Sequence, residues 1–355
     1  MPQFLLVRSP DLENVWPFVH QRLLDRLGAL GITRVLELSR GEAISNHTDL
    51  AGVDAVSLFG GRLTDECVER APSLKMVGCN TDNTGRGLPL EALSAAGIPV
   101  VDTTRAWGQS VAELALSLAL AALRRVPQWH AQLTAGERSW HYEAQQYCDA
   151  TGFTNGELGA KRIGVIGLGQ IGGRVARWCA ALAQDAATGE EIAGRVLGFD
   201  PYLPEGVAEQ WGVTRIDIDQ LVDESEVVFV TVPPTPTAKH LLSRERIGRL
   251  QKGALVVVVT RAHAVDMAAL RERILADELA AAFDVYDVEP LPTDDPLRGR
   301  ANVVHTPHIA GRTREANLRT ADIIADDFAR VLRGERPQHE LTAQAVKVRL
   351  GEIIR

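Results

Sequence analysis

Apolar positions in the first hundred residues fall into short runs separated by amphipathic stretches. Patterns typical of helices, at 15–29 and 65–71, lie between runs typical of strands. These strand-like runs occupy residues 4–7, 35–38, 55–58, 75–77 and 100–101. Strands that alternate with helices usually form a parallel sheet with helices on its faces. The first part of the chain is therefore predicted to be a small parallel α/β domain.

A second series of strand-like runs starts after residue 160. These runs occupy residues 163–166, 194–199, 227–232, 254–259 and 303–304. Most of them are apolar without alternation, which is typical of parallel strands buried on both faces. A long helical pattern follows at 313–333. If that helix returns to the first domain, the second α/β unit is an insertion between two parts of the first.

One further helical pattern, at 110–123, is apolar on almost every side. Such a helix has to be buried, either between two domains or between two subunits. Together with the aromatic segment 140–142 it provides more apolar surface than one solvent-facing helix carries. The pattern therefore predicts a homodimer.

Three glycines follow the first strand of the second series. Gly167, Gly169 and Gly172 stand at the spacing of a dinucleotide-binding turn. They allow a tight turn, a close approach of the backbone to a pyrophosphate, and close packing of helix on strand. The helix that starts there would bind the pyrophosphate at its amino terminus. Ordinary turns contain similar glycines, so the residue that follows the next strand matters.

That residue is Asp200. An acid in this place accepts hydrogen bonds from the ribose hydroxyls of NAD and repels the 2′-phosphate of NADP. Its separation from Gly172 exceeds the roughly 20 residues of the minimal motif, and a surface loop absorbs the difference at little cost. The alternative is a surface acid at a strand end. We expect an NAD site with preference over NADP.

Composition narrows the class of protein. With 355 residues, 45% of them hydrophobic and 24% charged, the chain is typical of a globular protein with two domains. A net charge of −8 argues against a nucleic-acid partner, and no apolar run reaches the roughly 18 residues of a membrane span. The four cysteines lack metal-ligand spacing and are expected to be free thiols. The sequence thus predicts a cytoplasmic protein without a membrane or metal site.

Three further segments, 259–266, 282–292 and 305–311, lie at or just past the ends of predicted strands. Ligands of open α/β sheets bind at that edge. The chemically active residues of these segments are Arg261, Glu289 and His308. An arginine holds a carboxylate and polarises an adjacent carbonyl with its fixed donors, and a histidine exchanges a proton near neutral pH. Alone, each residue would more often be a cap or turn residue, but their common placement favours a site.

Taken with the glycine turn, these segments resemble the D-isomer-specific 2-hydroxyacid dehydrogenases. That family includes D-lactate, D-3-phosphoglycerate, glyoxylate/hydroxypyruvate, phosphite and formate dehydrogenases. The resemblance covers nearly the whole chain, with further landmarks at residues 97–100, 110–113, 156–159, 232–236, 284–290 and 306–309. It implies two parallel-sheet α/β domains, a Rossmann nucleotide domain inserted into a flavodoxin-like substrate domain. The expected domains are 1–108 for the first part of the substrate domain, 109–306 for the NAD-binding domain, and 307–355 for the return to the substrate domain.

The resemblance also implies roles for individual residues. Arg261 is the catalytic arginine, Glu289 the acid, and His308 the proton donor and acceptor, while a hydride moves between nicotinamide and a small 2-hydroxy or 2-keto acid. Glu289 beside His308 would stabilise the protonated imidazole. The residues implied to line NAD are Gly167, Gly169, Gln170, Ile171, Gly172, Asp200, Val232, Pro233, Val259, Thr260 and Asp284. His263 and His305 are expected to be solvated or packed.

Residues 79–89 occupy the place of the family's carboxylate-binding loop. The expected substrate contacts are Thr84, Gly85 and Arg86, together with Arg261. Arg86 would pair with a second negative group of the substrate, such as a carboxylate or a phosphonate. The alternative is a solvated loop arginine. The expected partner is a small anionic molecule.

Two other functions stay open. The first is oxidation of phosphite or a phosphonate on the same scaffold; formate oxidation fits less well, because that branch of the family lacks the acid equivalent to Glu289. The second is a non-catalytic, NAD(H)-sensing protein like the corepressors that share this scaffold and keep the same three residues. Turnover of NADH with a panel of 2-keto acids separates these functions.

Overall fold

The computed structural model describes all residues except 40, 81–87, 137–151, 186, 191 and 351–355. The described chain divides into two compact units. The first unit consists of residues 1–107, 235–237 and 312–355, and the second of residues 108–234 and 238–311. Each unit has its own sheet and its own hydrophobic core.

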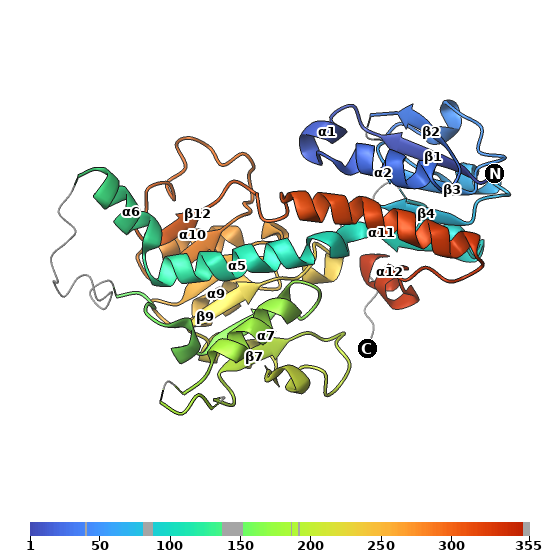
Figure 1. Cartoon of the computed structure of the whole chain (residues 1–355). Helices are drawn as coiled ribbons and strands as arrows, with labels where there is room; N and C mark the ends of the chain where they lie inside the picture. The colour runs from blue at the N-terminus through green and yellow to red at the C-terminus, as the bar shows by residue number, and fades with distance from the viewer. Residues whose placement is uncertain (40, 81–87, 137–151, 186, 191, 351–355) are drawn as a thin grey trace. The chain divides into compact units, whose positions relative to one another are not determined.

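The described part of the first unit contains a five-stranded parallel sheet (Figure 1). Its strands are β1 (Gln3–Arg8), β2 (Ile32–Glu37), β3 (Ala55–Phe59), β4 (Met76–Cys79) and β5 (Val100–Asp102). They lie in the order β2-β1-β3-β4-β5, which is the flavodoxin-like order. Each apolar run predicted to be a strand in this part of the chain overlaps one of these strands.

Both ends of the chain supply helices to the first unit. They are α1 (Leu12–Val15), α2 (Val19–Gly28), α3 (Asp65–Glu69), α4 (Leu90–Ala95), α11 (Arg314–Leu332) and α12 (Ala343–Leu350). In α11, Phe328 stacks on Phe4 of β1 with ring centroids 5.6 Å apart. Ile324 of the same helix lies against Gly78, where a Cβ atom would come within 3.0 Å of it. The helix predicted at 313–333 thus packs into the core of the first unit, and the second unit is an insertion.

The helix predicted at 15–29 is wrong in its extent. Helix α2 begins only at Val19, and α1 is a separate turn before it. Pro17 explains the break, because a proline disfavours helical backbone at the preceding residue. Trp16 accordingly has φ −133° and ψ 74°, and Phe18 has a left-handed φ of 74°.

The two edges of the first sheet differ. Residues 339–341 cover β5, where the N–H group of Leu341 donates to the carbonyl of Val100 at 2.7 Å. The buried carboxylate of Asp327 in α11 holds this covering segment by accepting the N–H groups of Gln338 and His339. Within the described residues, no strand pairs with the outer edge of β2. Ile32 in that strand is 52% exposed.

The described part of the second unit contains a seven-stranded parallel sheet. Its strands are β6 (Ile163–Ile166), β7 (Val196–Phe199), β8 (Thr214–Arg215), β9 (Val227–Val230), β10 (Leu255–Val258), β11 (Ala280–Phe283) and β12 (Val303–His305). They lie in the order β12-β11-β10-β9-β6-β7-β8. The order of strand addition reverses between β6 and β9, and Rossmann folds bind dinucleotides at such a reversal.

Helices of the second unit are α5 (Gly108–Leu123), α6 (Val126–Thr134), α7 (Gly172–Leu182), α8 (Ile218–Glu224), α9 (Arg244–Arg249) and α10 (Met267–Leu275). Helix α5 packs against α7 and against strands β10 to β12. One side of it, with Glu113, Ser117 and Leu120, is exposed in the single chain.

A helical stretch that includes α5 is unusually apolar. Among the described residues, 103–123 is long and apolar enough to cross a membrane by length and composition alone, with a mean hydropathy of 1.3. Half of its most apolar 18 residues are buried inside the protein, and the buried core helices of soluble proteins have the same length and composition.

Candidate functional site

The predicted site residues of the second unit follow the carboxyl ends of its strands. In chain order, they are Gly167 after β6, Asp200 after β7, Val232 after β9, Arg261 after β10, Asp284 after β11 and His308 after β12. Because all seven strands are parallel, these residues lie together along the carboxyl ends of the strands. Open α/β sheets bind their ligands at these ends.

The glycine turn connects β6 to α7. Gly167 has a φ of +90°, and a Cβ atom there would lie 2.6 Å from the side chain of Val232. At Gly172, the first residue of α7, a Cβ atom would lie 1.8 Å from the carbonyl oxygen of Gly167. At Gly169 a Cβ atom would meet nothing within 4 Å. The outer glycines are therefore required by the protein's own packing, whereas Gly169 faces open space.

Asp200 ties the end of β7 to this turn. Its Oδ2 atom accepts the N–H group of Leu168 at 2.8 Å, and its Oδ1 atom accepts the N–H group of Tyr202 at 2.9 Å. The carboxylate is only partly buried. A negative charge is thus fixed beside the glycine turn.

Sequence reasoning missed Arg174, which lies in the first turn of α7. Its guanidinium donates to the carbonyl oxygen of Gln170 and contacts the side-chain oxygens of Gln170 and Gln109, each at 3.2 Å. A positive charge therefore lies on the glycine turn itself. The arginine two residues after the last glycine of the motif was the signal that could have identified it.

Two threonines connect the ends of the central strands. Thr231, after β9, donates its hydroxyl to the carbonyl of Gly167 at 2.7 Å, and Thr260, after β10, donates to the carbonyl of Val232 at 2.9 Å. Thr260 and Val259 are almost fully buried, whereas Pro233 is exposed. The sequence pointed to Thr260 but not to Thr231, whose contact depends on the shape of the turn.

Arg261 leaves the end of β10 and precedes the short 3₁₀ turn η8 (Ala262–Ala264). The residue is partly buried, and its Nη1 atom donates to the carbonyl of Thr260 at 2.7 Å. Strand β11 lies between β10 and β12 in the sheet. Arg261 and His308 therefore lie at the same sheet edge on either side of the segment that follows β11.

Asp284, directly after β11, is fully buried. Its Oδ1 atom accepts the hydroxyl of Thr306 at 2.6 Å and the N–H group of Ile309 at 2.9 Å, and its Oδ2 atom accepts the N–H group of Ala310 at 2.9 Å. These bonds hold the turn that carries His308, which has a left-handed φ of 54°. Such backbone persists only where the surroundings fix it. The role of Asp284 in lining NAD stays a prediction.

The structure brings Glu289 and His308 together. The Oε2 atom of Glu289 lies 2.7 Å from Nδ1 of His308, and its Oε1 atom accepts the N–H group of Tyr286 at 2.9 Å. Both side chains are more than a third exposed, at 36% and 39%, so they remain accessible. A carboxylate that holds one ring nitrogen of a histidine directs the other nitrogen outward and fixes its tautomer.

Part of the predicted site lies outside the described residues. This holds for the substrate contacts Thr84, Gly85 and Arg86, and for the aromatic segment 140–142. Their roles stay predictions.

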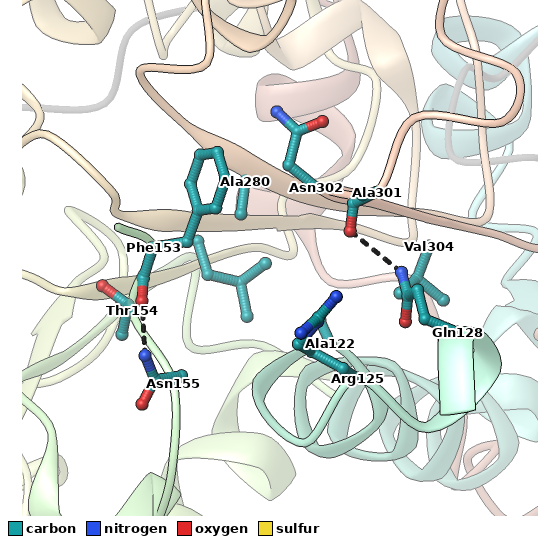
Figure 2. Close-up of a pocket in the computed structure, with 11 residues that line it drawn as sticks. Ala122, Arg125, Gln128, Phe153, Thr154, Asn155, Ala280, Ala301, Asn302 and Val304 are labelled. Atoms are coloured by element: carbon teal, nitrogen blue, oxygen red, sulfur yellow. Dashed lines mark hydrogen bonds between the residues drawn. The ribbon is translucent and has the colours of Figure 1, made fainter. Parts of the chain in front are cut away.

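A small pocket in the second unit lies at the amino-terminal ends of the strands, opposite the candidate site (Figure 2). It is lined by residues at the beginnings of three strands, among them Leu255, Ala280 and Asn302, and by Arg125 and Gln128 next to them. Figure 2 shows the side-chain amide of Gln128 donating to the carbonyl of Ala301, at 2.9 Å. The predicted site residues follow the opposite ends of the strands, so this pocket is not part of the candidate site.

The fold and the site define a two-unit α/β protein with a Rossmann-type dinucleotide-binding unit. The family model described as D-isomer specific 2-hydroxyacid dehydrogenase, NAD binding domain, matches residues 116–310. The chain belongs to the D-isomer-specific 2-hydroxyacid dehydrogenase family, which confirms the resemblance seen in the sequence.

The match covers different shares of the length of the named relatives. The D-3-phosphoglycerate dehydrogenase of Methanocaldococcus jannaschii is 37% identical over 281 residues, which make up 78% of this chain and 49% of that protein. The glyoxylate reductase of Korarchaeum cryptofilum is 30% identical over 300 residues, which make up 83% and 84% of the two chains. The chain thus spans about half the length of the first relative and most of the second.

A solved structure of similar fold is the phosphoglycerate oxidoreductase from Rhizobium etli. It has a TM-score of 0.77 and 24% sequence identity, and the match covers 98% of this chain and 100% of that one. At this identity the likeness shows the fold alone.

Proposed function

We propose that this chain is an NAD-dependent oxidoreductase that transfers a hydride between nicotinamide and a small 2-hydroxy or 2-keto acid. The observation that carries the proposal is the contact of 2.7 Å between Glu289 and His308 at the carboxyl edge of a Rossmann sheet. Relatives named D-3-phosphoglycerate dehydrogenase and glyoxylate reductase support it. We assign the cofactor to the second unit, and the substrate to Arg261 and the loop with Thr84, Gly85 and Arg86.

The residues around the glycine turn fit a dinucleotide. Gly169 faces open space, the amino terminus of the 11-residue helix α7 follows it, and Arg174 adds a positive charge. These are the features that bind a pyrophosphate. Asp200 beside the turn is placed to accept ribose hydroxyls. When bound, the nicotinamide gives or takes the hydride.

The protein's own residues handle the proton and the substrate's charge. Because Nδ1 of His308 contacts Glu289, its Nε2 atom is the one that exchanges a proton with the substrate oxygen. In reduction, Nε2 gives its proton to the carbonyl oxygen, and in oxidation it takes the proton of the hydroxyl. The Glu289 carboxylate stabilises the protonated imidazole in both directions. Arg261 binds the substrate carboxylate with its forked donors.

The test is NADH oxidation by the full chain with glyoxylate, pyruvate, hydroxypyruvate and 3-phosphohydroxypyruvate, compared with His308→Ala. We expect His308→Ala to lower kcat about 10²–10⁴-fold, because it removes the general acid, and to leave the Kd of NADH within about twofold. His263→Ala, a histidine after β10 that the proposal does not use, is the matched control and should keep wild-type kcat.

Each result has a defined meaning. A folded His308→Ala variant with wild-type turnover would rule out the proton-transfer role. NADH binding without turnover of any keto acid would favour a sensing protein, and reduction of NAD by phosphite would favour the phosphonate-type alternative.

Two further properties belong to the proposal. We infer a preference for NAD over NADP from the charge of Asp200, and a cytoplasmic homodimer that uses α5 and α6. The support for a dimer is apolar exposure on these helices, where Leu120, Val126 and Leu133 are 38%, 54% and 54% exposed. A patch of this kind on a soluble protein usually marks an interaction surface.

A further inference from the structure

Tyr286 contacts both segments that carry the Glu289–His308 pair. It lies on the segment between β11 and Glu289, and it is only 8% exposed. Its hydroxyl lies 3.1 Å from Nδ1 of His305 and 3.2 Å from the carbonyl oxygen of Thr306. One side chain from the first segment thus contacts two successive residues of the segment that leads to His308.

The backbone of Tyr286 acts on the other member of the pair. Its N–H group donates to Oε1 of Glu289 at 2.9 Å, while Oε2 of the same carboxylate contacts His308. Residue 286 therefore fixes the acid through its main chain and the histidine segment through its side chain.

His305 anchors this arrangement to a third segment. Its Nε2 atom lies 3.0 Å from the carbonyl oxygen of Leu297, and because a carbonyl only accepts, Nε2 carries the hydrogen. Nδ1 is then free of hydrogen and accepts the hydroxyl of Tyr286. The rings of Tyr286 and His305 also stack, with centroids 6.0 Å apart and an interplanar angle of 21°.

Both groups are kept uncharged near neutral pH. Burial raises the pKa of Tyr286 to about 12, with the neighbouring Asp284 adding to the effect. Burial also lowers the pKa of His305 from its ordinary value of 6.5. The hydrogen bond between a neutral phenol and a neutral imidazole therefore persists across the pH range in which the proposed proton transfer works.

We propose that Tyr286 and His305 are positioning residues that set the approach of Glu289 to His308. The proposal rests on the proposed function only for its kinetic test. Neither side chain exchanges a proton with substrate; they hold the segments on which the acid and the histidine stand. A small displacement of a catalytic group is costly for rate even where binding is unchanged.

The test compares Tyr286→Phe, His305→Leu and the double variant. Each single variant removes the Tyr286–His305 hydrogen bond and keeps an apolar side chain in place; His305→Leu also removes the bond to the carbonyl of Leu297, and Tyr286→Phe the contact with the carbonyl of Thr306. We expect each to lower kcat about tenfold, the value of one typical hydrogen bond, with the KM of the keto acid within about twofold. The loss in the double variant should be smaller than the two single losses combined, since the two changes share one bond.

His339→Leu is the matched control. This histidine is also partly buried and bonded through Nδ1, to Asp327 at 3.0 Å, but it lies in the first unit. It should lower thermal stability without changing kcat or the KM of the keto acid. Single variants with wild-type kcat would overturn the proposal, as would a fall in kcat that His339→Leu reproduces.

Amide hydrogen exchange of residues 303–312 gives a readout that needs no activity. Faster exchange in Tyr286→Phe and His305→Leu, but not in His339→Leu, supports the positioning role. Exchange at the wild-type rate overturns it. If the wild-type chain reduces no keto acid, the proposed function fails, and the exchange measurement still decides the positioning role on its own.

Discussion

At the scale of a single residue, Asp200 holds the glycine turn and is proposed to select the cofactor. Its two oxygens accept the N–H groups of Leu168 and Tyr202, which fixes the glycine turn against the end of β7. A carboxylate has about four acceptor positions, so these two bonds do not exhaust it. The same charge that stabilises the turn is therefore available to select the cofactor.

We predict that Asp200→Asn relaxes cofactor choice. The amide keeps the size of the side chain and one acceptor oxygen, but it removes the negative charge that repels a 2′-phosphate. The ratio of kcat/KM with NADH to kcat/KM with NADPH should fall by about tenfold or more, because like charges in contact cost several kcal/mol.

Steady-state kinetics with both cofactors measures this ratio. Asp185→Asn is the matched control, because Asp185 accepts two backbone N–H groups in a similar way but in an exposed loop. Equal use of NADH and NADPH by the wild-type chain would contradict the role of Asp200.

Single residues could be predicted from the sequence where chemistry follows directly after a strand. Glu289 and His308 are an example, because both lie just past strand ends of one parallel sheet, and the structure pairs them. Tyr286 could not be found in this way, and the one sign of Arg174 in the sequence is its position two residues after the last glycine of the motif. Their contacts depend on how a turn folds back on itself, and hydrophobic periodicity carries no information about that.

At the scale of elements, one glycine of the turn is required for folding, and another is expected to be required for cofactor binding. Gly172 has no room for a Cβ atom, whereas Gly169 has open space around it. We predict that Gly169→Ala folds with a wild-type melting temperature but weakens NADH binding about tenfold or more, since a methyl group occupies the place where the backbone approaches the pyrophosphate.

Gly172→Ala is the contrasting variant. Its Cβ atom would lie 1.8 Å from the carbonyl oxygen of Gly167 and 2.3 Å from the hydroxyl of Thr231. It should lower the melting temperature strongly or prevent folding, because overpacking against backbone cannot relax cheaply. Thermal unfolding and NADH fluorescence titration measure both effects. Unchanged NADH affinity in Gly169→Ala would show that the pyrophosphate does not lie there.

Element boundaries show where sequence reasoning ends. Buried parallel strands are easy to predict because their apolar runs are continuous, and both sheets contain the strands expected from such runs. The helix at 15–29 was predicted as one piece because its apolar period continues across Pro17. The helix is nevertheless interrupted, because a proline disfavours helical backbone at the residue before it.

At the scale of the whole molecule, buried ionisable groups limit the pH range of stability. Burial lowers the pKa of His20 in the first unit and of His305 in the second below 6.5. The stability they contribute is present above that value and is lost as pH falls through the folded pKa. The raised pKa of Tyr286 acts at the other end, where stability is lost between 10.0 and about 12.

We predict that the melting temperature falls as pH decreases from about 7 to about 5, and that His305→Leu reduces this fall. The reason is that a leucine side chain cannot take up a proton in the unfolded chain. Calorimetry at several pH values measures the slope. His47→Gln, which changes an exposed histidine, should leave it unchanged, and a slope in His305→Leu equal to the wild type would contradict the prediction.

The proposed dimer is also a property of the whole molecule. We predict a mass of twice 38.5 kDa by light scattering at micromolar concentration, and a shift to monomer in Leu133→Glu. A buried charge in an apolar interface costs several kcal/mol. Leu182→Glu changes a leucine that is also exposed, at 46%, but lies on α7, and should leave the mass unchanged. A wild-type mass of 38.5 kDa would contradict the dimer.

The unequal edges of the first sheet bear on behaviour in concentrated solution. Because residues 339–341 cover β5, β2 is the one open edge among the described strands of this sheet, and its Arg34 and Glu37 are charges of the kind that discourage edge pairing. Pairing through one open edge stops after two molecules. Removal of the covering segment would open the second edge as well, and a sheet with two open edges can extend without limit. In this sheet, residues 339–341 thus restrict edge pairing to one side.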